Sequence, residues 1–163
     1  MGMTLSEAVD FATLASLALA AFGVWWGAKT YRGQMNAQLF LSFTERYENM
    51  MCNAPAEFRA WRLNPDAAPP EMTQDVHTSI LAYLNLCSEE YFLWRNGYLD
   101  HAIWRIWSDE LERRLRSDLF RREWPKLREE FQSYGHFCEF VDKAQARAVS
   151  ADAHNSNLHA RKV

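Results

Sequence analysis

The chain has 163 residues and a net charge of −3, which leaves room for one compact domain. The slight acidity argues against nucleic acid as a partner, because phosphate binding needs a basic face. The cysteines are odd in number and lack C-x-x-C spacing, so we interpret them as reduced, buried thiols of a cytoplasmic body: Cys52, Cys87 and Cys138.

The first predicted element is an uncharged apolar run, residues 11–28, which we interpret as a transmembrane helix. At about 1.5 Å per residue the run reaches roughly 27 Å, close to the roughly 30 Å of a hydrocarbon core. We expect the helix to begin at Leu5, since Thr4 and Glu7 have capping-box spacing, and residues 1–10 to form a short extracytoplasmic N-terminus. A cleaved signal peptide and a buried helix of a soluble protein are the two alternatives.

The charges that flank this run predict its orientation. Lys29 and Arg32 follow it, whereas only acidic residues precede it. Basic residues accumulate on the cytoplasmic side of membrane spans. We therefore expect a single-pass protein of the plasma (inner) membrane, with its N-terminus outside and its C-terminal domain in the cytoplasm.

One face of this helix carries only small residues. On a helical wheel they share one side and end in a Gly-x-x-x-Gly pair, which favours close approach of a second membrane helix. The alternative is that they reflect the ordinary Ala and Gly content of membrane spans. The helix-packing face comprises Ala12, Ser16, Ala20, Gly23 and Gly27.

Residues 29–148 are predicted to form a helical cytoplasmic domain, since no strand-like alternation occurs. The first helix continues until Pro55 stops it. Gly97 is placed to close a helix in the left-handed conformation, Asp100 and Ser117 to cap the next two, and Pro125 to kink or split the second of these. The expected later helices span 57–63, 71–96, 101–116, 118–132 and 136 to about 148, followed by a disordered tail, 149–163. The fold class is thus all-α, a transmembrane helix continuing into a small helical bundle.

Several segments resemble a known family. They are NLCSEEYFLWRNGYLDHAIWRIWSDEL, then RREW and FQSYGHFCEFVD, together with the tripeptide Glu45-Arg46-Tyr47 at the end of the first helix. This pattern is similar to that of bacterial single-span membrane proteins that share a domain of unknown function. The resemblance implies an all-helical cytoplasmic domain on one membrane helix, and it carries no established activity over to this chain.

Glu89 and Glu90 interrupt the apolar core of the longest helix of the domain. A buried carboxylate needs a partner or a raised pKa. Glu90 is therefore a candidate acid, base or metal ligand. The alternative is an ion pair with an arginine of a neighbouring helix, such as Arg46 or Arg59.

No other pattern predicts chemistry. The chain lacks nucleophile motifs and zinc spacings, His136 with Cys138 being the nearest approach, and we predict no catalytic, cofactor or metal residues. The basic residues are interleaved with acids, so we weigh two roles for them, a solvated face with local ion pairs and contact with anionic lipid. The candidates for headgroup contact are Lys29, Arg32, Arg113, Arg114, Arg121 and Arg122.

The sequence therefore favours a non-enzymatic, membrane-anchored interaction or scaffold module, an accessory subunit of a membrane complex. Its expected partners are membrane lipid and either another membrane protein or further copies of itself. The alternative is a membrane-attached enzyme or ligand sensor that uses the region of Glu89 and Glu90.

Overall fold

The computed structural model of the protein describes residues 4–64 and 68–160, without the side chains of residues 7, 8 and 148–160. The described part contains six α-helices, one 3-10 helix and no strand, which confirms the predicted all-α fold with a long apolar N-terminal helix. It forms two compact units, residues 1–41 and 42–163.

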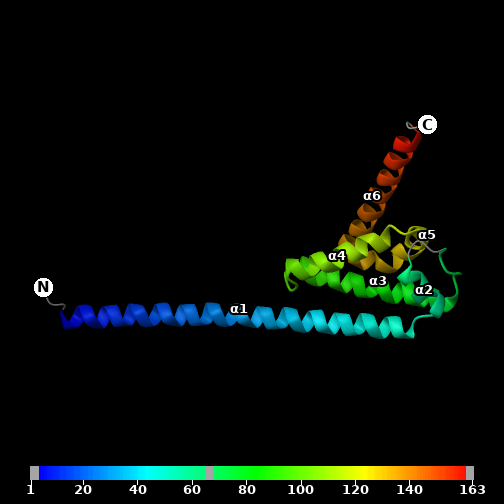
Figure 1. Ribbon diagram of the computed structural model, residues 1–163. Coiled ribbons are helices and arrows are strands. Elements are labelled where there is room, and N and C mark those ends of the chain that lie inside the picture. The colour runs from blue at the N-terminus through cyan, green and yellow to red at the C-terminus, as the bar shows by residue number, and fades with distance from the viewer. Residues whose placement is uncertain (1–3, 65–67, 161–163) are drawn as a thin grey trace. The chain divides into compact units, whose positions relative to one another are not determined.

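Helix α1, Leu5–Asn53, accounts for nearly all of the first unit and begins and ends where the sequence predicts (Figure 1). Its large apolar side chains, from Phe11 to Trp26, are exposed. Among the described helices it is the one long and apolar enough to cross a membrane, and its most apolar window has no buried residue. These side chains are therefore not packed in a core as in a soluble protein, and α1 is a candidate membrane span.

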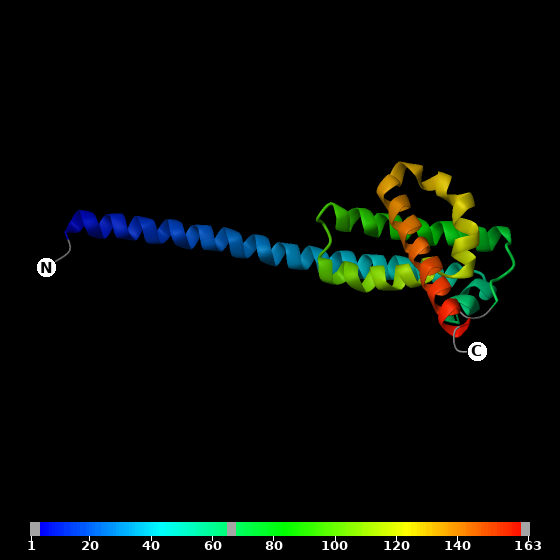
Figure 2. The ribbon, with the colours of Figure 1, turned by 90° about the horizontal axis from the view of Figure 1, so that it is seen from above.

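The second unit is a bundle of helices around a shared aromatic core. Helices α3 and α4 lie side by side in both views, and α6 packs across them (Figures 1 and 2). The last turns of α1 contribute Phe43, whose ring lies 5.6 Å from that of Trp107. The elements are α2 Ala56–Leu63, α3 Gln74–Arg95, α4 His101–Leu115, α5 Asp118–Leu127, η1 Arg128–Tyr134 and α6 Gly135–Ala160.

Local signals explain where α3 and α4 begin and end. Thr73 accepts a hydrogen bond from the backbone N–H of Val76 at 3.2 Å, which starts α3 three residues later than the expected Glu71. Asp100 caps α4 by accepting from the N–H of Ala102 at 2.7 Å, as predicted. Gly97 has a φ of +75°, which confirms the left-handed residue predicted between the two helices.

The chain turns a corner between α5 and α6. Pro125 lies inside α5, and the α-helix gives way to the 3-10 helix η1 shortly afterwards. Because proline has no N–H to donate, the helical ladder is weakened at this point. Ser117 is the N-cap residue of α5, as predicted, but its side chain makes no capping hydrogen bond, since its hydroxyl donates back to the carbonyl of Arg114 at 2.7 Å.

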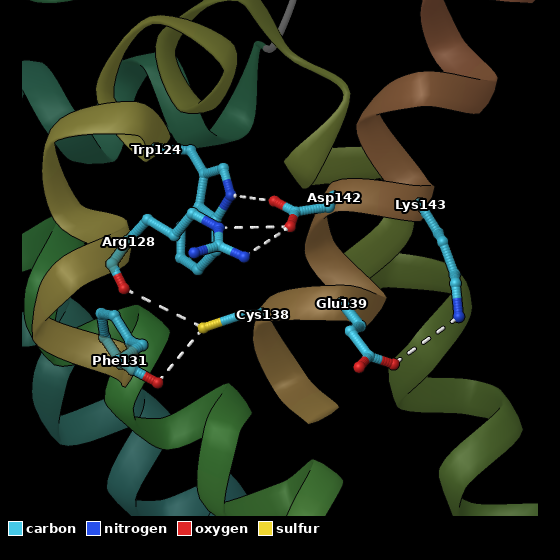
Figure 3. Close-up of polar contacts among 7 residues, drawn as sticks. All are labelled: Trp124, Arg128, Phe131, Cys138, Glu139, Asp142 and Lys143. Atoms are coloured by element: carbon cyan, nitrogen blue, oxygen red, sulfur yellow. Dashed lines mark hydrogen bonds and ion pairs between the residues drawn. The ribbon is translucent and has the colours of Figure 1, made fainter. Parts of the chain in front are cut away.

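Asp142 of α6 joins this corner to the last helix (Figure 3). It accepts a hydrogen bond from the indole N–H of Trp124 at 2.8 Å and two from the guanidinium of Arg128 at 3.1 and 3.2 Å. The Cys138 thiol donates to the carbonyl of Phe131 at 3.2 Å. These contacts fix α6 against α5 and η1 and bury the aromatic side chains between them.

Two sequence predictions need correction here. Helix α6 continues to Ala160, so residues 149–160 are helical where a disordered tail was expected, and residues 161–163 lie outside the described part. No glycine or proline occurs between His136 and Ala160 to end the helix, and the segment is rich in alanine. Cys52 is exposed rather than buried, while Cys87 and Cys138 are buried, and all three are free.

Candidate functional site

A cavity of about 440 Å³ lies within the second unit, between α3, α4 and the last turns of α1. This volume falls in the range of small-molecule sites. Most of its wall is apolar. The apolar lining comes from Phe43, Leu86, Ile106, Trp107 and Leu111, and the polar lining from Thr44, Tyr47, Arg62, Tyr83, Cys87, Glu90 and Glu110.

Glu90 supplies an unusual carboxyl group to this cavity. It is only 9% exposed, and within the described part of the chain neither a hydrogen bond nor an ion pair satisfies it. Burial raises its pKa from the usual 4.5 to about 8, against the opposing attraction of Arg46. The protonated form of Glu90 is therefore favoured at neutral pH.

The ion pair expected for Glu90 is made by its neighbour instead. Arg46 binds the carboxylate of Glu89 through two hydrogen bonds of 2.5 and 3.0 Å, and Arg59 donates to the carbonyl of Cys52 at 2.9 Å. Adjacent residues on a helix point about 100° apart, so a single arginine cannot serve both carboxylates equally. The prediction that an arginine seals Glu90 is wrong, and Glu89 lies on a different, smaller cavity of about 260 Å³.

A charged cluster closes the other end of the large cavity. Arg62 of α2 is 9% exposed and binds Glu110 of α4 at 2.7 Å. Its guanidinium also lies 5.6 Å from the ring centre of Tyr47 and 5.8 Å from that of Tyr83. Arg114 binds the same carboxylate at 2.9 Å. One carboxylate thus holds two buried guanidinium groups in place.

Two side chains of the lining that could act as nucleophiles, Cys87 and Tyr83, stay protonated. Burial raises the pKa of the Cys87 thiol and of the Tyr83 hydroxyl well above their usual ranges. A thiol must ionise to act as a nucleophile or metal ligand. The cavity therefore favours binding over covalent catalysis.

The arginines of α4 and α5 that were predicted to contact lipid headgroups form ion pairs with neighbouring acids. Arg113 binds Glu110, Arg121 binds Asp118 at 2.6 Å, and Arg122 binds Glu123 at 2.7 Å. Arg114 is only 7% exposed, so the headgroup contact predicted for it is wrong. In the first unit Lys29 and Arg32 are exposed, and the Lys29 ammonium lies 5.5 Å from the ring centre of Trp25.

Two histidines are engaged in contacts within the bundle. His101 accepts from the indole N–H of Trp94 at 3.0 Å, and His136 lies 3.4 Å from the guanidinium of Arg95. Among the side chains that the structure describes, no group of three His, Cys, Asp or Glu residues is placed to hold a metal ion.

Sequence reasoning missed Arg62 and Glu110 and assigned Arg114 to the surface, although the pattern contained a signal. Arg62 follows Phe58 by four residues, so it lies on the apolar face of α2. Arg114 follows Leu111 by three and shares its buried face. An arginine at an apolar position of a helix indicates a buried charge with a partner nearby.

The predicted helix-packing face of α1 is open. An added Cβ at Gly23 or Gly27 would meet no atom within 4 Å, and Ala12, Ser16 and Ala20 are exposed.

Comparisons with protein-family models, curated proteins and solved structures find no match to this chain. The cavity and this face are therefore the features on which a function can be argued.

Proposed function

We propose that the protein is a non-enzymatic, membrane-anchored helical module that associates with another membrane protein or with further copies of itself. The observation that carries this proposal is the apolar surface of α1, from Phe11 to Trp26, whose side chains are exposed. Monomeric soluble proteins rarely expose continuous apolar surface of this extent. Lipid removes that surface from water.

The proposal includes an orientation. Lys29 and Arg32 lie on one side of the apolar stretch and Asp10 on the other. Since basic residues favour the cytoplasmic side, the second unit lies in the cytoplasm and the N-terminus outside the plasma (inner) membrane of a bacterium. This placement agrees with the single-span family that the sequence resembles.

The partner surface in this proposal is the small-residue face of α1. Without side-chain bulk at Gly23 and Gly27, the backbone of a second helix can approach closely enough for extensive van der Waals contact. Such packing drives association in lipid, where no hydrophobic effect acts between helices.

Substitution of both glycines tests the association. We expect Gly23→Leu with Gly27→Leu to abolish co-purification of a membrane partner, or to convert an oligomer into a monomer, in mild detergent. The matched control is Ala21→Leu with Ala28→Leu, which adds two leucines outside the small-residue face of the same helix. Equal behaviour of the two double variants in size-exclusion chromatography with light scattering would argue against the small-residue face.

A second candidate function is ligand sensing at Glu90. It is favoured by the cavity, which is lined by a buried carboxyl group without an ion pair in the described chain. Glu89 is less suited to this role, because its carboxylate is bound by Arg46 and does not line the large cavity. A membrane-tethered ligand sensor would link occupancy of the cavity to the packing of α1, α3 and α4.

A further inference from the structure

The large cavity is lined by two acids, and only one of them has an ion-pair partner among the described residues. Arg62 and Glu110 bind each other at 2.7 Å, and the rings of Tyr47 and Tyr83 flank the arginine. Glu90 remains as the one acid of the lining without an ion pair among the described residues. The cation whose charge acts on it, Arg46, is held by two hydrogen bonds to Glu89. An ammonium group in the cavity would therefore give the ionised form of Glu90 the partner that no described residue supplies.

An anionic ligand would fit the cavity less well. The free N–H of Arg62, at Nε, has almost no exposed surface, so a ligand in the cavity does not reach it. Glu90 follows Tyr83 by seven residues, about 10 Å along α3, which separates it from the arginine end of the cavity. An anion placed near Glu90 would meet a carboxyl group and no free donor of the arginine.

The rest of the cavity wall is apolar, so it fits the apolar part of a small ligand. Aromatic rings of Phe43 and Trp107 and the aliphatic side chains of Leu86 and Ile106 line the space beside Glu90. Small-molecule sites combine such apolar walls with a few placed polar groups. An ion pair is also stronger in these surroundings than in water, because the local dielectric constant is lower.

We propose that the cavity binds a small hydrophobic amine, whose ammonium group pairs with the carboxylate of Glu90 while its apolar body fills the space against Phe43 and Trp107. This inference rests on the second candidate function and names its ligand class. A single charged contact selects the amine, and the apolar wall supplies most of the contact area.

The pairing couples binding to a proton. Burial keeps Glu90 mostly protonated below its pKa of about 8, so an ammonium ligand must displace that proton. Affinity therefore rises with pH through the pKa of Glu90 and levels off only above it. The titratable and charged groups around Glu90 are Arg46 and Tyr47 on α1, Arg62 on α2, Tyr83, Cys87 and Glu89 on α3, and Glu110 on α4.

Calorimetric titration of the full-length protein in lipid nanodiscs tests the inference, with empty nanodiscs as the blank. The probes are 2-phenylethylamine, its neutral analogue 2-phenylethanol and the anion 3-phenylpropanoate. We expect the amine to bind most tightly at pH 8 and its affinity to fall on the order of 50-fold at pH 6, as the ionised fraction of Glu90 falls. Glu90→Gln should weaken amine binding at pH 8 at least tenfold and remove its pH dependence.

Two variants locate the effect. Glu139→Gln makes the same chemical change on exposed α6 and should leave amine binding unaltered. Ile106→Trp fills the cavity from its exposed rim and should abolish binding of every probe.

The outcomes separate the ligand class from the site. Equal or tighter binding of the alcohol or the carboxylate, lost in Ile106→Trp, would overturn the amine while leaving ligand sensing in place. Amine binding that Glu90→Gln does not weaken would also overturn it. Absence of binding by all three probes at millimolar concentration would overturn both the amine and the sensing role.

Discussion

Burial and charge have opposite effects on Glu90: burial raises the pKa of its carboxyl group, and the positive charge of Arg46 lowers it. Its carboxyl group lies among apolar side chains, and no arginine within the described chain is close enough to pair with it. Position on a helical wheel indicates that Glu90 faces the bundle, but the wheel does not indicate which residue of another helix faces it. Arg46 lies near both glutamates and binds Glu89.

Stability should therefore depend on pH through Glu90. Between its usual pKa of 4.5 and about 8 in the fold, the native state holds a proton that the unfolded chain has lost, so stability falls as pH rises across this window. Glu90→Gln stays neutral and should be more stable than the wild type at pH 8, on the order of 2 to 4 kcal/mol, with little difference at pH 4.5. Urea unfolding in detergent at both pH values, followed by tryptophan fluorescence, checks this; a difference that does not vary with pH would contradict it.

Arg62 should contribute to stability through its burial as well as its charge. Arg62→Ala removes the contact with Glu110, two aromatic neighbours and a buried side-chain stem, so we expect a loss of about 2 to 4 kcal/mol. Arg113 binds the same carboxylate but its side chain is 66% exposed, so Arg113→Ala should cost less than about 0.5 kcal/mol. Thermal unfolding of both variants would show the contrast, and equal costs would mean that burial of Arg62 is unimportant.

At the scale of the elements, Asp142 determines how α6 packs on the corner of α5 and η1. Asp142→Ala leaves the indole N–H of buried Trp124 without its acceptor, for an expected cost of about 1 to 3 kcal/mol. Glu139→Ala, one turn earlier on α6, removes only a 3.8 Å contact with Lys143 on the surface and should have almost no effect. Denaturant unfolding distinguishes them, and an inert Asp142→Ala would show that apolar packing alone positions α6.

Helix limits were predictable where a local signal sets them. Pro55 after α1, Gly97 after α3 and Asp100 before α4 each act through their own backbone or side chain. Ser117 does begin α5, but the hydrogen bond of its side chain was not predictable, because the hydroxyl bonds to the carbonyl of Arg114 in the preceding helix. The prediction was wrong for α6, because a lack of apolar residues indicates a lack of packing and does not by itself end a helix.

The cavity was beyond prediction because it has no sequence motif. Its lining comes from α1, α2, α3 and α4, and it exists only where their side chains leave space. The sequence did identify Glu90 as a carboxyl group within an apolar helix. Its pairing and the Arg62 cluster depend on contacts between helices that the sequence does not specify.

At the scale of the whole molecule, the two units differ in whether their large apolar side chains are buried. The second unit buries large side chains such as Phe58, Leu84 and Phe137, whereas the apolar stretch of α1 leaves Leu14, Phe22 and its neighbours exposed. A water-soluble chain would expose this surface at a large free-energy cost. Insertion into lipid removes the cost, and this is the central claim of the proposed function.

Cys52 offers the most direct test of that claim, because it is the exposed thiol of the second unit while Cys87 and Cys138 are buried. A membrane-impermeant maleimide is added to intact bacterial spheroplasts and, separately, to washed inside-out membrane vesicles. If α1 spans the membrane with the second unit in the cytoplasm, the protein will be retained in the vesicles and Cys52 will be labelled there but protected in spheroplasts. Labelling in intact spheroplasts, or loss of the protein from washed vesicles, would contradict the account.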